Sequence, residues 1–73
     1  MFILGISCFY HASAAGLIKD GEIINAVQEE RFTGIKNDSS FPQRSIEWCL
    51  SENNISAKDL KFIVFYVLIN EIY

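Results

Sequence analysis

The sequence predicts an α/β domain in which three antiparallel strands are followed by one helix and by a fourth strand parallel to the first. In the first 30 residues, apolar segments alternate with short polar turns, and the apolar stripe of a helix comes only after residue 42. A final apolar run then follows. A helix between two strands of one sheet forms a crossover, which places the last strand parallel to the first.

Two strands and a turn are predicted at the start of the chain. The first strand is Phe2–Ile6, whose unbroken apolar character is typical of a central strand covered on both faces. Gly5 within it indicates a bulge or a close approach of another group to the backbone. The second strand is predicted over Ala14–Ile18. Asp20 and Gly21 then form a strong hairpin signal, because both residues tolerate positive φ.

A third strand, a loop and a helix are predicted next. The return strand is expected over Ile23–Glu30, and the turn-forming residues of Phe32–Phe41 predict a connecting loop. Pro42 is expected as the first residue of a helix, where its missing N–H costs nothing. The helix is expected to end at Asn53 and Asn54. Its apolar stripe, at positions i, i+3 and i+4, consists of Ile46, Cys49 and Leu50.

The last predicted elements complete a recognisable topology. Ser56–Asp59 resembles a capping box with Asp in place of Glu, which predicts a single helical turn. The fourth strand is predicted over Lys61–Leu68 and would be an exposed apolar edge, which invites another strand or chain. A sheet ordered 3-2-1-4 with one helix on it is the opening half of a ribonuclease-H-like or actin-like ATPase domain. We therefore expect residues 1–73 to form part of such a domain.

Composition limits the kinds of partner. The chain has 73 residues, of which 51% are hydrophobic and 14% aromatic. A domain of this size buries only about 60% of its unfolded surface, so its stability is marginal without a partner. The apolar content argues against disorder. The net charge is −3 with no run of five like charges, so no nucleic-acid partner is expected.

Cysteine usage and hydropathy bear on the compartment. The spacing of Cys8 and Cys49 matches no zinc site, so no metal site is predicted. We expect both thiols to be buried and reduced, which is typical of a cytoplasmic protein. The N-terminal stretch MFILGIS has no basic leader and does not resemble a signal peptide. Phe62–Ile69 is far shorter than the roughly 20 residues that cross a bilayer, so no membrane partner is expected.

The segment between the first two predicted strands carries the candidate chemistry. Ser7, His11 and Ser13 supply two hydroxyls and an imidazole among small residues that let the backbone approach a ligand. His11 is the one group in this segment whose unperturbed pKa lies near neutrality, as proton transfer requires. A lone loop histidine is nevertheless more often structural or solvated, so both alternatives stay open. A nucleophilic Ser13 is not expected, because no triad is available.

Four stretches resemble, in order and spacing, the N-terminus of the O-carbamoyltransferases, a family that includes nodulation-factor and antibiotic carbamoyltransferases. These stretches are LGISCFYHASAA, DGEIINAVQEERFTGIKND, SSFPQRSIEWCL and LKFIVFY, between Ile3 and Tyr66. The resemblance implies an actin-like domain that passes a carbamoyl group to a substrate hydroxyl. A second domain of such enzymes makes carbamoyl-adenylate from carbamoyl phosphate and ATP. Iron is held by a later HxxxH motif and a distant aspartate, so this chain is expected to hold no cofactor by itself.

The resemblance also implies roles for particular residues. His11 matches the histidine of a family motif, FYHDSAA, and is expected to be catalytic, as the general base for the acceptor hydroxyl. Ser13 matches the serine of that motif. Ser13 and Glu30 are expected to contact substrate. Glu29 and Arg31 belong to the matching EERF segment, for which the resemblance implies no individual roles. As neighbours in the predicted strand, Glu29 and Glu30 are expected to point to opposite faces.

Departures from the family pattern predict a fragment that is inactive alone. Ala12 stands where the family commonly has Asp, and Gly34 and Asn37 stand where a basic residue and a histidine are common. After Tyr66 the likeness fails. Three functions remain open: the N-terminal fragment of an O-carbamoyltransferase, an interaction module, or a minimal nucleotide binder that should bind ATP poorly. The interaction module would dock through its last strand with a separately encoded remainder or with a second copy.

Overall fold

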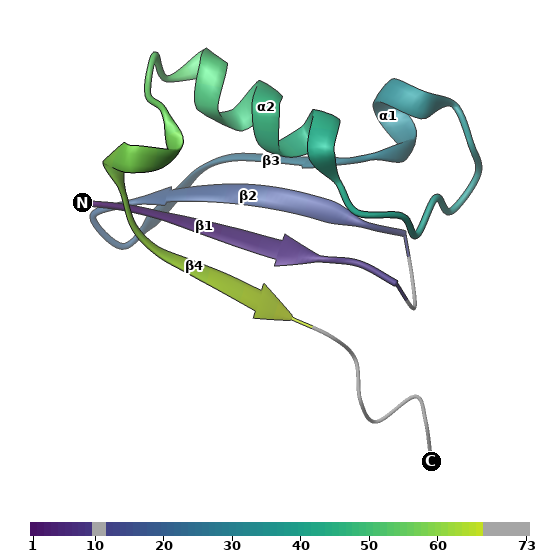
Figure 1. The fold of residues 1–73 in the computed structure, drawn as a ribbon, viewed down its shortest axis with the longest axis horizontal. Coiled ribbons are helices and arrows are strands. Elements are labelled where there is room, and N and C mark those ends of the chain that lie inside the picture. The colour runs from purple at the N-terminus through teal and green to yellow at the C-terminus, as the bar shows by residue number, and fades with distance from the viewer. Residues whose placement is uncertain (10–11, 67–73) are drawn as a thin grey trace.

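The structure, a computed structural model, describes residues 1–9 and 12–66 and has two layers, a sheet and a helix that crosses one of its faces (Figure 1). The elements are β1 (Phe2–Ser7), β2 (Ala14–Lys19), β3 (Glu22–Gln28), α1 (Glu30–Thr33), α2 (Gln43–Glu52), the 3-10 turn η1 (Ala57–Asp59) and β4 (Leu60–Tyr66). The four strands are ordered β3-β2-β1-β4. β1 is antiparallel to β2 and parallel to β4. The predicted fold class and sheet order are therefore confirmed.

The hairpin between β2 and β3 forms where the Asp-Gly pair predicts it. Asp20 has φ 50° and Gly21 has φ 88°, and positive φ at both positions is what a type I′ turn requires. The N-terminal ammonium of Met1 donates to the Asp20 carboxylate at 2.8 Å, and the Asp20 N–H donates to the Met1 carbonyl at 3.0 Å. This ion pair is exposed, so it adds little to stability.

The chain turns away from the sheet earlier than predicted. β3 ends at Gln28, and α1 begins at Glu30, so the strand predicted to reach Glu30 and the loop predicted from Phe32 are both wrong at this junction. Glu29 is the N-cap residue of α1, and its side chain is buried. That tertiary contact overrides the strand tendency of the preceding residues. Gly34, with φ 72°, ends the single turn of α1.

α2 packs on β2 and β3 and closes the core (Figure 1). It begins at Gln43, and Pro42 is its N-cap residue rather than its first helical residue. Cys49 of the predicted stripe is fully buried, and Ile46 packs partly buried against the core. The buried core consists of Leu4, Ile6, Cys8, Ala15, Leu17 and Cys49. α2 therefore covers the face of the sheet on which these strand residues lie.

The turn before the last strand is the predicted capping box. The Ser56 N–H donates to the Asp59 carboxylate at 2.9 Å, and the Asp59 N–H donates to the Ser56 side chain. β4 begins one residue earlier than predicted, and the predicted strand residues Val67 and Leu68 lie outside the described residues. The register shift between β1 and β4 lies at Phe2 and Ile3. The bulge predicted at Gly5 is therefore not found there, because the irregularity in β1 lies at its first two residues.

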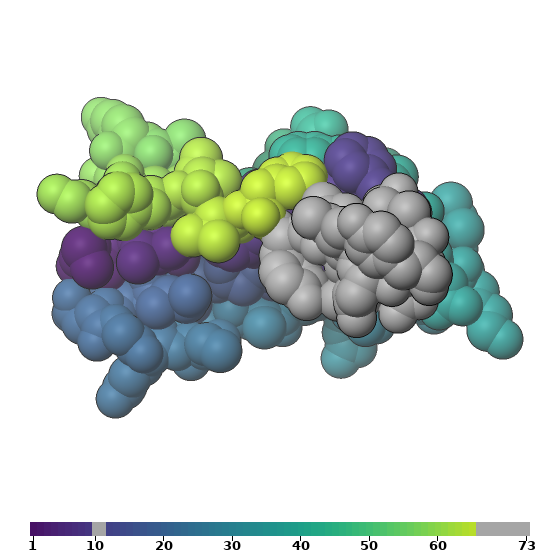
Figure 2. Space-filling model, turned by 90° about the horizontal axis from the view of Figure 1, so that it is seen from below, coloured from purple at the N-terminus to yellow at the C-terminus, as the bar shows by residue number. Residues whose placement is uncertain are grey.

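The opposite face of the sheet is uncovered in the part of the chain that the structure describes. Seen from that side, β4, β1 and β2 lie next to one another (Figure 2). A row of small residues crosses this face from Gly5 through Gly16 to Ala26, and Val64 lies beside Gly5. This row lines a shallow hollow of about 250 Å³. β1 is an inner strand as predicted, but cover on both of its faces is not found among these residues.

β4 forms an edge of the sheet and exposes four successive apolar side chains. The exposed fractions are 56% for Phe62, 59% for Ile63, 54% for Val64 and 50% for Phe65. Side chains alternate between the two faces of a strand, so both sides of this edge are apolar. The predicted exposed apolar edge is therefore confirmed.

Candidate functional site

The predicted site lies where three strand ends meet. In the register of the sheet, Ser7 at the end of β1 pairs with Ala14 at the start of β2, and Ala14 pairs with Gln28 at the end of β3. The connection from β1 to β2 therefore starts and ends at this end of the sheet. His11 lies outside the described residues, so its predicted catalytic role stays a prediction. The residues on either side of it are described.

Both flanks of this connection are anchored to the same short loop. The Phe9 N–H donates to the Ser39 carbonyl at 2.8 Å. The Ser13 N–H and hydroxyl both donate to the Asp38 carbonyl, at 2.7 and 2.9 Å. Ser13 is fully buried. Its hydroxyl is thus used within the fold, and its predicted contact with substrate stays a prediction.

Asp38 organises the loop that provides these anchors. Its carboxylate accepts hydrogen bonds from the Ser40 hydroxyl at 2.6 Å, the Ser40 N–H at 3.0 Å and the Thr33 hydroxyl at 2.8 Å. The bonds from Ser40, and then the bond from Thr33, hold the pKa of the Asp38 carboxyl below its ordinary value. The sequence indicates Asp38 only as one of the turn-forming residues of the predicted Phe32–Phe41 loop. Its neighbours Asn37, Ser39 and Ser40 are turn formers too, so composition could not single it out.

Glu29 attaches α2 to the end of the sheet. Its side chain is only 2% exposed. One carboxylate oxygen accepts the Ser45 N–H at 2.9 Å and the Ser45 hydroxyl at 2.7 Å, and the other accepts the Arg44 N–H at 3.3 Å. These N–H groups belong to the first turn of α2, where a negative charge also interacts favourably with the helix dipole. Glu29 therefore has a structural role that its sequence context did not reveal.

Glu30 faces a different environment from Glu29. It lines a hollow of about 490 Å³, and one of its carboxylate oxygens accepts the Asn37 N–H at 2.9 Å. The full lining is Ala14, Ala26, Val27, Gln28, Glu30 and Arg31. The side chains of Glu29 and Glu30 point in different directions, as predicted. The reason differs from the predicted one, because the two residues lie at the start of α1 and not in a strand. The hollow has a floor of small side chains with polar and charged groups beside it.

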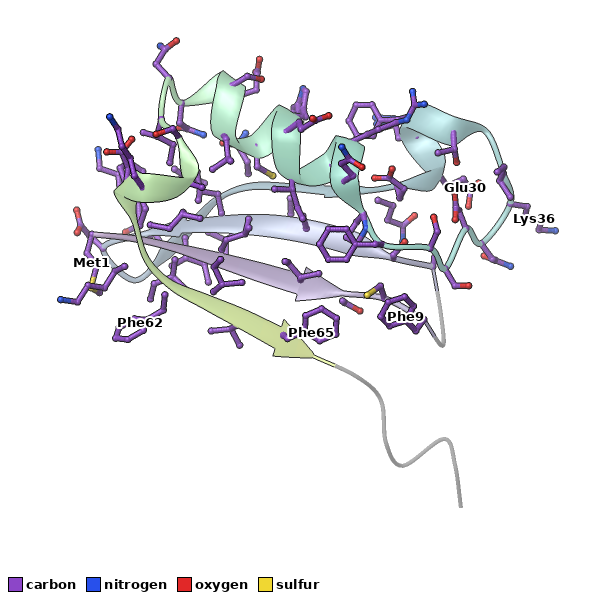
Figure 3. The ribbon with its side chains drawn as sticks, viewed as in Figure 1. Met1, Phe9, Glu30, Lys36, Phe62 and Phe65 are labelled. Atoms are coloured by element: carbon purple, nitrogen blue, oxygen red, sulfur yellow. The ribbon has the colours of Figure 1, made fainter. Side chains whose placement is uncertain are left out.

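Phe9 adopts an unusual backbone conformation beside this region. Its φ is 82°, in the left-handed region, which costs a non-glycine residue about 1–2 kcal/mol. Its ring is 58% exposed, and its centroid lies 6.2 Å from that of Phe65. Figure 3 shows the two side chains next to each other near the carboxyl end of β4. Nothing in the local sequence of Phe9 signals a positive φ, so this conformation could not be predicted from the sequence.

The described residues offer no metal centre and no membrane span. Within them, no group of three His, Cys, Asp or Glu side chains could hold a metal ion. The iron that the family resemblance implies therefore does not fit these residues. Both thiols are free and buried, as predicted, and burial raises the pKa of each. No helix in residues 1–9 and 12–66 has the length and apolar character to cross a membrane.

We expect Glu29→Ala to lower the free energy of unfolding by about 2–3 kcal/mol, because the buried Ser45 N–H and hydroxyl lose a charged acceptor. Urea unfolding, followed by circular dichroism and by the fluorescence of Trp48, measures the change. Glu29→Gln keeps one acceptor oxygen and should lose less. Glu47→Ala, on the exposed side of α2, is the control and should stay within about 0.5 kcal/mol of the wild type. A Glu29→Ala chain as stable as the control would contradict the assigned role.

The lowered pKa of Asp38 predicts a defined acid sensitivity. The ionised carboxylate stabilises the fold above its unfolded pKa of about 3.9, and this stabilisation is lost as the pH falls through the lower folded-state pKa. Asp38→Asn should therefore lower the thermal unfolding midpoint at neutral pH and flatten its decline below about pH 4. Ser40→Ala should have a smaller effect of the same kind, and little effect in the Asp38→Asn background. Parallel pH profiles for wild type and Asp38→Asn would show this prediction to be wrong.

Comparison with known proteins places these features in a family. Residues 2–72 match the family model described as the carbamoyltransferase N-terminus. Protein sll1178 of Synechocystis sp. is 61% identical over 64 residues, covering 88% of this chain and 10% of that protein. The nodulation protein NolNO of Sinorhizobium fredii is 41% identical over 58 residues, covering 80% of this chain and 8% of that protein.

An archaeal relative extends this pattern. Protein MJ1051 of Methanocaldococcus jannaschii is 39% identical over 61 residues, covering 84% of this chain and 11% of that protein. The chain thus spans about a tenth of the length of these three relatives. Because the family model matches nearly the whole sequence, the chain belongs to the carbamoyltransferase N-terminal family.

Proposed function

We propose that this chain is the N-terminal part of an O-carbamoyltransferase and supplies one side of the site at which a carbamoyl group is transferred to a substrate hydroxyl. The observation that carries the proposal is the family match over residues 2–72. The donor would be carbamoyl phosphate, activated with ATP as carbamoyl-adenylate elsewhere in the enzyme. We also propose that these 73 residues are inactive by themselves. The chain covers about a tenth of the length of the relatives that it matches, which supports this proposal.

In the proposed transfer step, the acceptor oxygen bonds to the carbamoyl carbon, and the bond from that carbon to the adenylate oxygen breaks. We assign His11 as the base that takes the hydroxyl proton, because it is the one histidine of the chain and matches the family motif. Glu30 would contact substrate from the lining of the 490 Å³ hollow, with one carboxylate oxygen held by Asn37. Ser13 would contribute by holding the loop near the substrate. We place the reaction in the cytoplasm, where buried thiols stay reduced.

Complementation tests the proposed function. The chain is co-expressed with the Synechocystis relative from which its 64 matching residues have been deleted, and radiolabelled carbamoyl phosphate is supplied with ATP and a panel of pyranoside acceptors. We expect no transfer by either part alone and transfer by the pair. His11→Ala should abolish transfer while the two parts still co-purify, since only the proposed base is removed. Ser51→Ala, in the exposed last turn of α2, is the control and should leave transfer unchanged.

Two outcomes would overturn parts of this proposal. Transfer by the 73-residue chain alone would show that it is not inactive. Full transfer by the His11→Ala pair would remove His11 from the catalytic step.

A second candidate function is an interaction module that docks through β4 with a separately encoded remainder or with a second copy. The observation that favours it is the apolar β4 edge, where four successive side chains are half exposed. Long apolar edge strands are templates for pairing with another chain. In this function, association itself would be the activity, and the unpaired backbone of β4 would supply the hydrogen bonds.

Sedimentation tests this second function. We expect the chain to sediment above its monomer mass of 8.3 kDa, or to be retained by the truncated relative, and Ile63→Lys to abolish the association because it puts a charge on the edge. Ile23→Lys, at the other side of the sheet and 72% exposed, should have no effect. A stable monomer that the truncated relative does not retain would contradict the docking function.

A further inference from the structure

We propose that Asp38 is a positioning residue for the proposed transfer reaction. It acts through its loop, which joins Glu30 of α1 to the connection between β1 and β2. This proposal rests on the function proposed above and deepens it, because Glu30 is the proposed substrate contact and the connection carries the proposed base. The two are tied together by three consecutive residues, Asn37, Asp38 and Ser39.

The loop holds Glu30 and one end of the connection through neighbouring backbone groups. The Asn37 N–H donates to a carboxylate oxygen of Glu30 at 2.9 Å, which fixes that side chain in the lining of the 490 Å³ hollow. The carbonyl of the next residue, Asp38, accepts the Ser13 N–H at 2.7 Å and the Ser13 hydroxyl at 2.9 Å. A shift of the loop therefore moves both partners at once.

The other end of the connection is bound to the same loop. The Ser39 carbonyl accepts the Phe9 N–H at 2.8 Å, so two successive carbonyls hold the two ends. Ser13 is fully buried, and its own carbonyl accepts the Glu29 N–H at 2.9 Å. The loop therefore sets where both ends of the connection lie relative to Glu30.

The Asp38 carboxylate determines the shape of this loop. Asp38 is only 7% exposed, and its carboxylate accepts the Ser40 N–H at 3.0 Å, the Ser40 hydroxyl at 2.6 Å and the Thr33 hydroxyl at 2.8 Å. Thr33 is the last residue of α1, the helix that begins with Glu30. The carboxylate thus also ties the loop to the helix that presents the proposed substrate contact. Functional sites keep their geometry when hydrogen bonds behind the functional groups hold those groups in place.

Thr33→Val and Thr33→Ser are matched variants that test this role. Valine has the shape of threonine but no hydroxyl, so it removes one hydrogen bond to the Asp38 carboxylate, whereas serine keeps it. In the complementation assay, we expect Thr33→Val to raise the KM for the acceptor about tenfold and to lower kcat, because small displacements of reacting groups reduce the rate steeply. Thr33→Ser should retain the wild-type constants.

The KM separates positioning from stability. A variant that merely unfolds lowers the concentration of the active complex, so its apparent kcat falls while its KM stays unchanged. Displacement of Glu30 from the substrate changes the KM itself. Asp38→Ala removes all three hydrogen bonds to the carboxylate and should raise the KM further than Thr33→Val. An unchanged KM in Thr33→Val would overturn the proposal, even if Asp38→Ala does not fold.

Amide hydrogen exchange of the 73-residue chain tests the coupling without the reaction. In Thr33→Val, we expect the amides of Phe9, Ser13 and Asn37 to exchange about tenfold faster than in the wild type, because their loop opens locally. The amide of Leu17, in the covered core, is the internal control and should keep its wild-type rate. Equal acceleration at all four amides would show only a loss of global stability and would contradict the positioning role.

The wild-type complex keeps this test apart from the proposed function. If it transfers carbamoyl and Thr33→Val does so with unchanged constants, the positioning role fails and the function stands. If the wild-type complex transfers nothing, the proposed function fails, and the positioning role fails with it whatever the exchange rates are.

Discussion

The buried carboxylate of Glu29 connects the sheet to the helix, and much of the structure depends on it. It accepts two hydrogen bonds from Ser45 and one from the Arg44 N–H, at the start of α2. Its backbone N–H donates to the Ser13 carbonyl at 2.9 Å. One residue thus fixes the end of β3, the start of β2 and the first turn of the helix. In a domain this small, where little apolar surface is buried, such a connection has a large relative weight.

Asp38 extends this connection to the region of the candidate site. The Asp38 carboxylate orders its own loop, and the Asp38 and Ser39 carbonyls hold Ser13 and Phe9 on either side of the motif histidine. Glu29 therefore holds the start of α2 against the sheet. Asp38 orders the loop before α2, and that loop is hydrogen-bonded to both ends of the connection between β1 and β2. Both carboxylates thereby stabilise the loop to which Phe9 and Ser13 are hydrogen-bonded.

In the described residues, one face of the sheet is covered by α2 and the other face is uncovered. α2 covers the face that carries Leu4 and Leu17, whereas the row from Gly5 to Ala26 and the β4 edge stay uncovered in the described residues. Glycine in a strand interior weakens the strand and is typical of close approach by another backbone or a ligand. At Gly5 an added Cβ would meet its nearest atom only at 3.8 Å, so the packing seen here does not require glycine.

The sequence by itself determined the four strands, the main helix α2, their order and the family, but not the short helix α1. Apolar runs predicted the strands, the Asp20–Gly21 pair predicted the hairpin, and the Ser56–Asp59 box predicted the turn before β4, because each signal is complete within a few neighbouring residues. Only the tertiary structure decided the roles of Glu29 and Asp38 and the backbone conformation of Phe9. The Glu29–Ser45 and Ser13–Asp38 contacts join residues 16 and 25 positions apart. Local sequence patterns do not encode such pairings. A glutamate or aspartate that will be buried has the same local sequence signal as one that stays solvated, because its hydrogen-bond partners are distant in the chain.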